Sequence, residues 1–190
     1  MGITSWLIDS VEKKSGENMD YMRDIASASP AAVYKFALCF PFMMHRKAAP
    51  LDAYFLAAFG ALKHEDCGPC LQIAVNQAIA AHVAPELISA AVAGGSALDP
   101  EHKAYFDFGG AVAANAPETE ELRLQVSQRL SPAAMADLAI GIASARVFPA
   151  LKRALGHAQS CSIVQVKVPG AEASKPRLGA VASSPIRKTG

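Results

Sequence analysis

Apolar residues recur along most of the chain every three or four positions, the spacing that places them on one face of a helix. Alanine is frequent between them, and β-branched residues are scattered instead of grouped in alternating runs. Because alanine has the highest helix propensity, composition and spacing favour the same structure. The pattern predicts an all-α core, with residues 163–168 as the one strand-like run.

Prolines mark where these helices begin. Three pairs combine a capping side chain with a proline at the first helical position: Ser29-Pro30, Asp99-Pro100 and Ser131-Pro132. Further starts are predicted at Pro50, Pro85 and Pro117. The predicted helices cover about residues 18–28, 30–44, 50–63, 67–82, 85–93, 100–114, 118–130 and 132–155, the last kinked or stopped at Pro149. Small residues would let two of these helices approach closely: Ala57, Ala58 and Gly60 on one, and Ala111, Ala113 and Ala114 on the other.

Composition divides the 190 residues into an N-terminal helical arm (1–28), a helical core (29–160) and a basic tail (161–190). This length suits one packed domain. From Pro169 onward the chain is rich in Pro, Gly, Ser and Ala, and few large apolar groups remain to offset the entropy of ordering. We therefore expect a mobile tail, with the cations Lys175, Arg177, Arg187 and Lys188.

Charge and hydropathy limit the classes of partner. The formal net charge is +1, so no general field attracts nucleic acid or an anionic membrane, and small molecules or proteins are the expected partners. The hydrophobic fraction is 52% and the mean hydropathy +0.20, high values for a soluble monomer. They predict a homo-oligomer, with a large buried interface between subunits or an enclosed pocket.

Targeting signals are not evident. Lys35 and Pro41 interrupt one apolar run, and Pro50, Asp52 and Lys63 bracket the next, so neither reaches the ~20 residues of a membrane-spanning helix. Residues 1–14 lack a basic leader and a long apolar segment. Four cysteines do not form the dense framework of a small secreted protein, and we expect a cytoplasmic location.

The run His64-Glu65-Asp66-Cys67-Gly68-Pro69-Cys70 places a CxxC pair at the start of a predicted helix. Asp66 is the expected N-cap, and Pro69 is tolerated in the first turn. The partial positive charge of a helix N-terminus stabilises a thiolate, and two cysteines at this spacing can close a small disulfide. A redox-active thiol pair is the leading hypothesis.

Three other interpretations of the cysteine pair are a thioredoxin site, a zinc site and a pair of inert cysteines. CGPC also resembles the thioredoxin active site, but there the pair follows a buried strand, whereas residues 51–63 are Ala-rich and helical in pattern. A zinc site would need two further ligands, and only isolated residues such as His64, His82 and Cys161 are present, so no metal or cofactor is expected. Buried, inert cysteines are the remaining alternative.

An Ala-rich helical chain with Glu-Asp-Cys-Gly-Pro-Cys and a following apolar helix resembles the AhpD-like, carboxymuconolactone decarboxylase superfamily over about residues 50–155. The resemblance implies an AhpD-like helical bundle that associates into trimers or hexamers. It also implies a peroxidase or disulfide oxidoreductase that takes hydroperoxides or disulfides, with a dithiol protein as electron donor. The alternatives are a catalytically idle oligomeric binding scaffold and a decarboxylase-like enzyme.

The alkylhydroperoxidase branch has a histidine four residues after the second cysteine and a glutamate twelve before the first, where this chain has Ala74 and Phe55. His64 and Glu65 are the nearest replacements for this proton relay. The family's better-studied members attack with the second cysteine, here Cys70. Helix-terminus electrostatics instead favour Cys67 as the more exposed, lower-pKa nucleophile, with Cys70 as the resolving thiol.

Structural roles are expected for several other residues. Gln72 and Asn76 share one helix face and are expected to form hydrogen bonds, and His82 is expected to cap its helix. Two apolar groups are expected in the core, with pocket lining as the alternative for some members: Tyr105, Phe106 and Phe108, and Phe42, Met43 and Met44.

Overall fold

The computed structural model describes residues 3–160 and 167–169. This part of the chain is all-helical and contains no strand, which confirms the predicted fold class. The strand-like run at 163–168 lies mainly outside the described residues, and so does the predicted tail at 161–190. The helices are α1 (Ile3–Ser15), α2 (Asp20–Ala28), α3 (Pro30–Ala37), α4 (Phe40–Met43), α5 (Leu51–His64), α6 (Gly68–Ala80), α7 (Pro85–Val92), α8 (Pro100–Ala114), α9 (Thr119–Ser127) and α10 (Pro132–Ala154).

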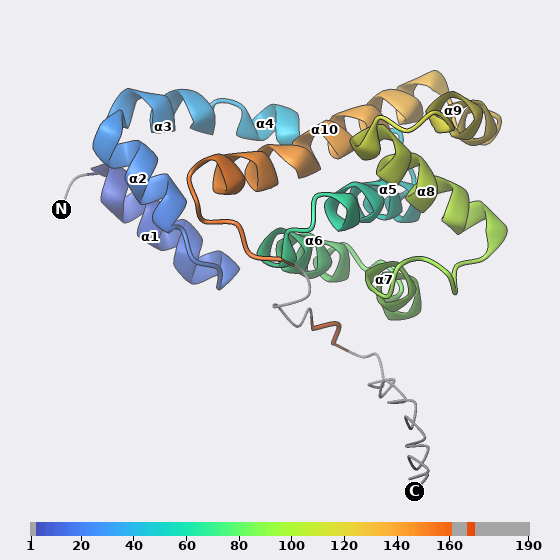
Figure 1. Cartoon of the computed structure of the whole chain (residues 1–190), viewed down its shortest axis with the longest axis horizontal. Coiled ribbons are helices and arrows are strands. Elements are labelled where there is room, and N and C mark those ends of the chain that lie inside the picture. Colours follow the sequence, from blue (N-terminus) through green and yellow to red (C-terminus); the bar gives the residue numbers. More distant parts are fainter. Residues whose placement is uncertain (1–2, 161–166, 170–190) are drawn as a thin grey trace, which may run out of the picture.

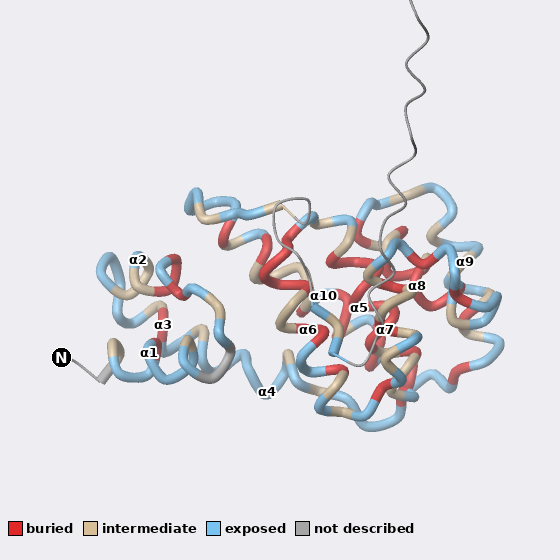
Figure 2. Tube along the Cα trace, turned by 90° about the horizontal axis from the view of Figure 1, so that it is seen from below, coloured by how far each residue is buried: buried red, intermediate tan, exposed pale blue. Residues whose placement is uncertain are grey.

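Two hydrophobic clusters organise these helices. The larger lies among α5 to α10 and includes the fully buried Leu56, Phe59 and Leu138. The smaller joins α1, α2 and α3 around Ile8 and Tyr21, and the C-terminal half of α10 packs against it. The long helix α10 runs from α9 to the N-terminal helices (Figure 1), and the buried residues are concentrated in α5, α6 and α8 (Figure 2).

The closest helix crossing in the large cluster is between α5 and α8, and two glycines make it possible. A Cβ at Gly60 would lie 1.9 Å from the carbonyl oxygen of Phe106, and one at Gly109 would lie 1.8 Å from that of Ala57. Both contacts are with backbone, which cannot move aside as a side chain can. The predicted role of small residues is therefore confirmed for Ala57 and Gly60, and Gly109 is their partner on α8.

Most of the predicted helix starts are confirmed. Helices begin at Pro30, Pro85, Pro100 and Pro132, and the Asp99 side chain accepts hydrogen bonds from the backbone N–H groups of the first turn of α8. Ser131 caps α10 in the same way, whereas Ser29 makes no side-chain cap at α3. Helix α10 continues through Pro149 to Ala154, so the prediction that it stops at Pro149 was wrong.

The predicted helix at 30–44 is two helices, α3 and α4, separated at Leu38 and Cys39. Pro41 accounts for the break, because a proline ring clashes with the carbonyl four residues earlier and supplies no N–H. Cys39 is exposed at this turn and is not disulfide-bonded. The residues of α4 are not buried, so the expected core role of Phe42, Met43 and Met44 was wrong.

A buried carboxylate fixes the segment that leads from α4 to α5. Asp137 Oδ2 accepts hydrogen bonds from the N–H groups of Lys47, Ala48 and Ala49 at 2.8, 2.6 and 2.9 Å. His45 Nε2 lies 3.4 Å from the other carboxylate oxygen. The donors, led by Ala48 and Ala49, hold the pKa of Asp137 below its ordinary value. This contact holds the α4–α5 connection against α10.

By length and composition alone, helix α10 could span a membrane. The sequence-based prediction covered only the two apolar runs before residue 64 and did not identify this one. Within the fold it packs along α5. It also carries the buried Asp137 and Lys152. These features are those of a helix that packs in a folded core.

Candidate functional site

Cys67 and Cys70 form a disulfide at the beginning of α6, with their Cα atoms 5.3 Å apart. Cys67 is the N-cap residue, its backbone is extended, and its carbonyl accepts from the N–H of Leu71. Asp66 was predicted to be the N-cap and is not. It adopts a left-handed backbone with a φ of 49°, which aspartate tolerates better than most residues, and its carboxylate accepts from Ser160 Oγ at 2.6 Å.

Both cysteines are buried, with relative exposures of 3% for Cys67 and 6% for Cys70. The expectation that Cys67 is the more exposed thiol was therefore wrong. The segment after α10 lies against the motif: the N–H of Gly68 donates to the carbonyl of Gln159 at 3.1 Å, and Ser160 contacts Asp66. Residues about ninety positions away in the sequence thus hold the start of α6, a contact that no local pattern predicts.

Glu65 is not the solvated residue expected before a helix. Its side chain is only 8% exposed, and its carboxylate oxygens lie 2.7 Å from Arg146 Nε and 2.6 Å from Arg153 Nη2, both on α10. Arg153 also donates to the Glu65 carbonyl. Two cations hold this carboxylate in place, and it does not line the cavity described next.

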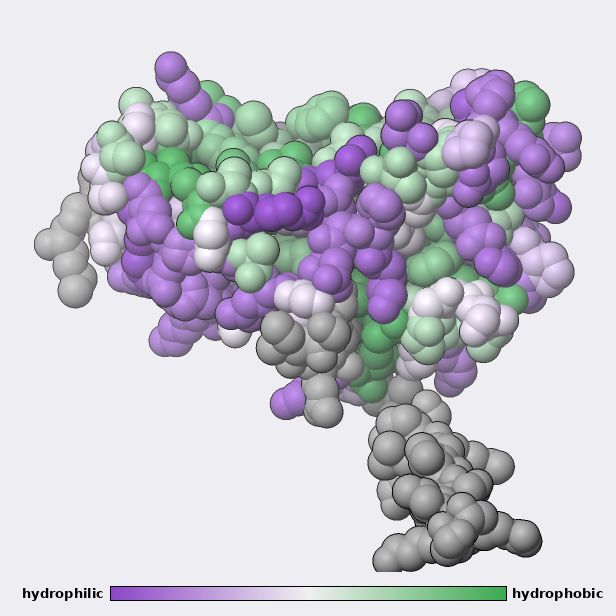
Figure 3. Space-filling model, viewed as in Figure 1, coloured by the Kyte–Doolittle hydropathy of each residue, from purple (hydrophilic) through white to green (hydrophobic). Residues whose placement is uncertain are grey.

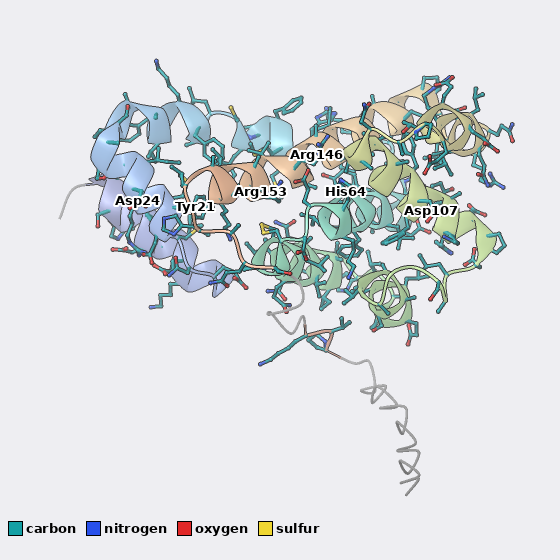
Figure 4. The ribbon with its side chains drawn as sticks, viewed as in Figure 1. Tyr21, Asp24, His64, Asp107, Arg146 and Arg153 are labelled. Atoms are coloured by element: carbon teal, nitrogen blue, oxygen red, sulfur yellow. A yellow bond between two sulfur atoms is a disulfide. The ribbon has the colours of Figure 1, made fainter. Side chains whose placement is uncertain are left out.

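His64 is exposed at the end of α5 and makes no hydrogen bond or ion pair with the described residues. Figure 4 labels His64 on α5 and Arg146 and Arg153 on α10, and shows the disulfide as a yellow bond beside α6. The structure therefore brings together Cys67, Cys70 and the Glu65 cluster at one end of α6. It does not place His64 or Glu65 in the cavity that Cys70 lines.

An apolar cavity of about 760 Å³ lies between the N-terminal helices and α5, α6 and α10. Cys70 forms part of its wall, and Cys67 does not. The α6 residues that line the cavity are Cys70, Ile73, Ala74, Gln77 and Ala80, which recur at helical spacing along one side of the helix. Its volume is in the range of small-molecule sites. An apolar compound in the cavity would lie against Cys70.

The two positions that correspond to the relay residues in the resemblance drawn from the sequence both line this cavity. Ala74 follows Cys70 by one helical turn, and Phe55 lies on α5. A histidine and a glutamate there would project into the same space as Cys70, but here both positions are apolar. The wall around the sulfur therefore carries no titratable group at either relay position.

Few polar groups interrupt the apolar wall. Ser144 Oγ is buried and has no hydrogen-bond partner among the described residues. Burial raises the pKa of Tyr21 to about 12 and also raises the pKa of Tyr54. Lys152 is 4% exposed, and burial lowers the pKa of its ammonium group. Sequence analysis did not select Ser144 or Lys152, although polar residues within the apolar run 132–154 were a visible signal.

The remaining predicted residues have structural roles. Gln72 Nε2 donates to Asn76 Oδ1 at 2.9 Å, as expected for one helix face, and Gln72 also bonds the backbone of Lys167. His82 adopts a left-handed backbone directly after α6, at the predicted helix end. Tyr105, Phe106 and Phe108 are buried core residues, and Tyr105 donates to Glu101 instead of lining the cavity.

Met43 and Met44 line the cavity, the alternative considered for them, although Met44 is also 63% exposed. Within the described residues, no group of three or more His, Cys, Asp or Glu side chains is arranged to hold a metal ion. Searches against protein-family models, curated proteins and solved structures find no match to this chain.

Proposed function

We propose that this chain is a thiol-dependent oxidoreductase that reduces hydroperoxides of apolar compounds through Cys67 and Cys70. The observation that carries the proposal is the disulfide at the start of α6 with one of its cysteines in the wall of an apolar cavity. A CxxC pair at a helix N-terminus is suited to exchange chemistry because the helix end favours the thiolate. The cavity accounts for an apolar substrate.

The reaction begins with the reduced pair. The Cys70 thiolate attacks the terminal peroxide oxygen, an S–O bond forms, the O–O bond breaks, and the alkoxide takes a proton from water to leave as the alcohol. The Cys67 thiol then attacks the sulfenic sulfur, which forms the disulfide and releases water. An external dithiol protein returns two electrons by thiol–disulfide exchange and leaves as its own disulfide.

Cys70 is the proposed nucleophile because it lines the cavity, whereas Cys67 does not and is flanked by Asp66 and Gly68, which bond to the segment after α10. This assignment replaces the one based on exposure of Cys67. It agrees with what the resemblance to the AhpD-like superfamily implies. The AhpD-like bundle, a cytoplasmic location and a trimeric or hexameric assembly belong to the same proposal.

An idle oligomeric scaffold is the second candidate. Two observations favour it: Glu65 is held by two arginines, and the relay positions are occupied by Ala74 and Phe55. Large apolar side chains are exposed on α3 and α4, where hydrophobic residues gather on the surface (Figure 3), as a subunit interface would require. Such a protein would have a cavity and a fold but unreactive thiols. A decarboxylase is disfavoured because that chemistry does not use a cysteine pair.

The test is consumption of cumene hydroperoxide with dithiothreitol as the electron donor. We expect turnover by the wild type and loss of turnover in Cys67→Ser and Cys70→Ser. Cys39→Ser is the matched control, because Cys39 is exposed and unpaired, and it should retain full activity. With peroxide and dimedone, Cys67→Ser should carry the sulfenic acid adduct at Cys70. An adduct at Cys67 in Cys70→Ser alone would reverse the assignment, and wild-type thiols that do not react would favour the scaffold.

A further inference from the structure

The cavity has two polar features on one helix. Gly141, Ser144, Phe148 and Lys152 follow one another on α10 at intervals of three or four residues, and all four line the cavity. At the helical rise of 1.5 Å per residue, the Cα atoms of Ser144 and Lys152 are separated by roughly 12 Å along the axis. The remaining wall is dominated by aliphatic and aromatic side chains. Lys152 and Ser144 are the polar residues that α10 contributes to this lining.

Lys152 is the buried cation of the cavity. Its ammonium group lies 5.2 Å from the centre of the Tyr21 ring, and Glu17 is its electrostatic neighbour. No hydrogen bond or ion pair joins Lys152 to the described residues, and it lies where the apolar cavity adjoins a smaller polar pocket that Glu17 also lines. The other cationic group at the cavity, Arg46, is exposed at the rim and donates to the carbonyl of Ala49.

Ser144 is the second polar group. Its hydroxyl is buried and lacks a partner among the described residues, which costs free energy unless a ligand supplies the hydrogen bond. Gly141, one turn earlier, packs against the Tyr54 ring: a Cβ there would lie 2.6 Å from a ring carbon. The wall at this end is therefore closely packed around an unused hydroxyl.

We propose that the cavity binds a long-chain carboxylic acid whose hydroperoxide group lies toward the end of the acyl chain that is remote from the carboxylate. The carboxylate binds Lys152, the apolar chain lies along α10, and the hydroperoxide oxygen bonds Ser144 in the space that Cys70 also lines. The assignment of the substrate class rests on the proposed function. Binding of the acid itself requires only the cavity, and it can be measured without turnover.

The experiment is calorimetric titration of the full-length oxidised protein with three probes: decanoate, decanol and ω-hydroxydecanoate. They have matched chains, and the third carries a hydroxyl at the end of the chain opposite the carboxylate. Hydrogen bonds to charged groups are stronger than those between neutral groups, so decanoate should bind roughly ten-fold or more tightly than decanol. ω-Hydroxydecanoate should bind several-fold more tightly than decanoate because of its hydroxyl. Ser144→Ala should remove this difference and leave the affinity for decanoate unchanged.

Lys152→Met should abolish the preference for decanoate and leave decanol binding unchanged, which also shows that the cavity is intact. Lys103→Met is the matched control, because Lys103 is an exposed lysine paired with Asp107, and it should keep the preference. Equal wild-type affinity for decanoate and decanol, or no binding of either, would overturn the proposal. This comparison uses the wild-type protein alone, so it does not depend on whether the variants fold. A cavity filled by another part of the chain or by a second copy would give that result.

The failures of the two proposals are distinguishable. Cumene hydroperoxide lacks a carboxylate, so its turnover without decanoate binding would overturn only the substrate class. Decanoate binding through Lys152 with thiols that do not react with peroxide would overturn only the oxidoreductase and leave a binding site for long-chain acids.

Discussion

The crossing of α5 and α8 positions the helix that forms one wall of the cavity, and adjacent glycines on α8 provide a sharp test of it. In Gly109→Ala, the new Cβ would lie 1.8 Å from the carbonyl oxygen of Ala57, far inside the 3.4 Å at which ordinary contact begins. In Gly110→Ala, the nearest atom is the Gly60 carbonyl oxygen at 3.6 Å, which is ordinary contact. The two substitutions add the same methyl group to the same helix.

Their effects on the free energy of unfolding should have opposite signs. Overpacking costs ~1–3 kcal/mol, and Gly109→Ala should be at the upper end because the obstacle is backbone. Alanine in place of glycine in a helix interior contributes ~0.5–1 kcal/mol where space allows, so Gly110→Ala should stabilise by about that amount. For a domain of this size 1 kcal/mol corresponds to ~2–4 °C, which predicts melting temperatures that differ by roughly 10 °C.

Thermal and urea unfolding of both variants, followed by far-ultraviolet circular dichroism, measure the difference. Equal midpoints for Gly109→Ala and Gly110→Ala would show that α5 and α8 do not cross at this point, and the placement of the cavity wall would be wrong.

Three further variants test other contacts. Asp137→Asn should destabilise by about 2 kcal/mol at neutral pH in urea unfolding. Because the folded pKa of Asp137 is lowered, its contribution is present above the unfolded pKa of ~3.9 and is lost as pH falls, so a penalty that persists unchanged in acid would contradict the geometry. Glu65→Gln should cost ~1–2 kcal/mol, reduced from the buried-pair range because Arg146 and Arg153 are half-exposed, and should speed reduction of the disulfide by dithiothreitol; unchanged reduction kinetics would count against the cluster. At Asn115, with a φ of 52° at the end of α8, alanine should cost ~1–2 kcal/mol and glycine little, and equal melting points for the two would refute the left-handed cap.

Local signals predicted most of the fold. Proline with a capping residue identified the starts of α8 and α10 because both act within one turn. Small residues identified the α5 side of its crossing with α8. Local rules failed at Pro149, where α10 continues through the proline. A proline inside a helix tends to interrupt it. Here Phe148 and Leu151, on either side of Pro149, pack against the N-terminal cluster, and the helix continues.

The candidate site was only partly predictable for a different reason. The cysteine pair and its helix followed from spacing within seven residues. Its burial depends on Gln159 and Ser160, and the state of Glu65 depends on Arg146 and Arg153, all far away in the sequence. Lys152 and Ser144 acquire their role only because the N-terminal helices pack near α10 and leave the cavity between them. Such contacts have no local pattern.

The most direct test of the proposed chemistry is a single turnover without an external dithiol. Protein with Cys67 and Cys70 reduced is mixed with one equivalent of cumene hydroperoxide, and the alcohol product and the cysteines are measured by mass spectrometry. The account predicts one equivalent of cumyl alcohol and quantitative formation of the Cys67–Cys70 disulfide. Persistence of both thiols with the peroxide intact would contradict it.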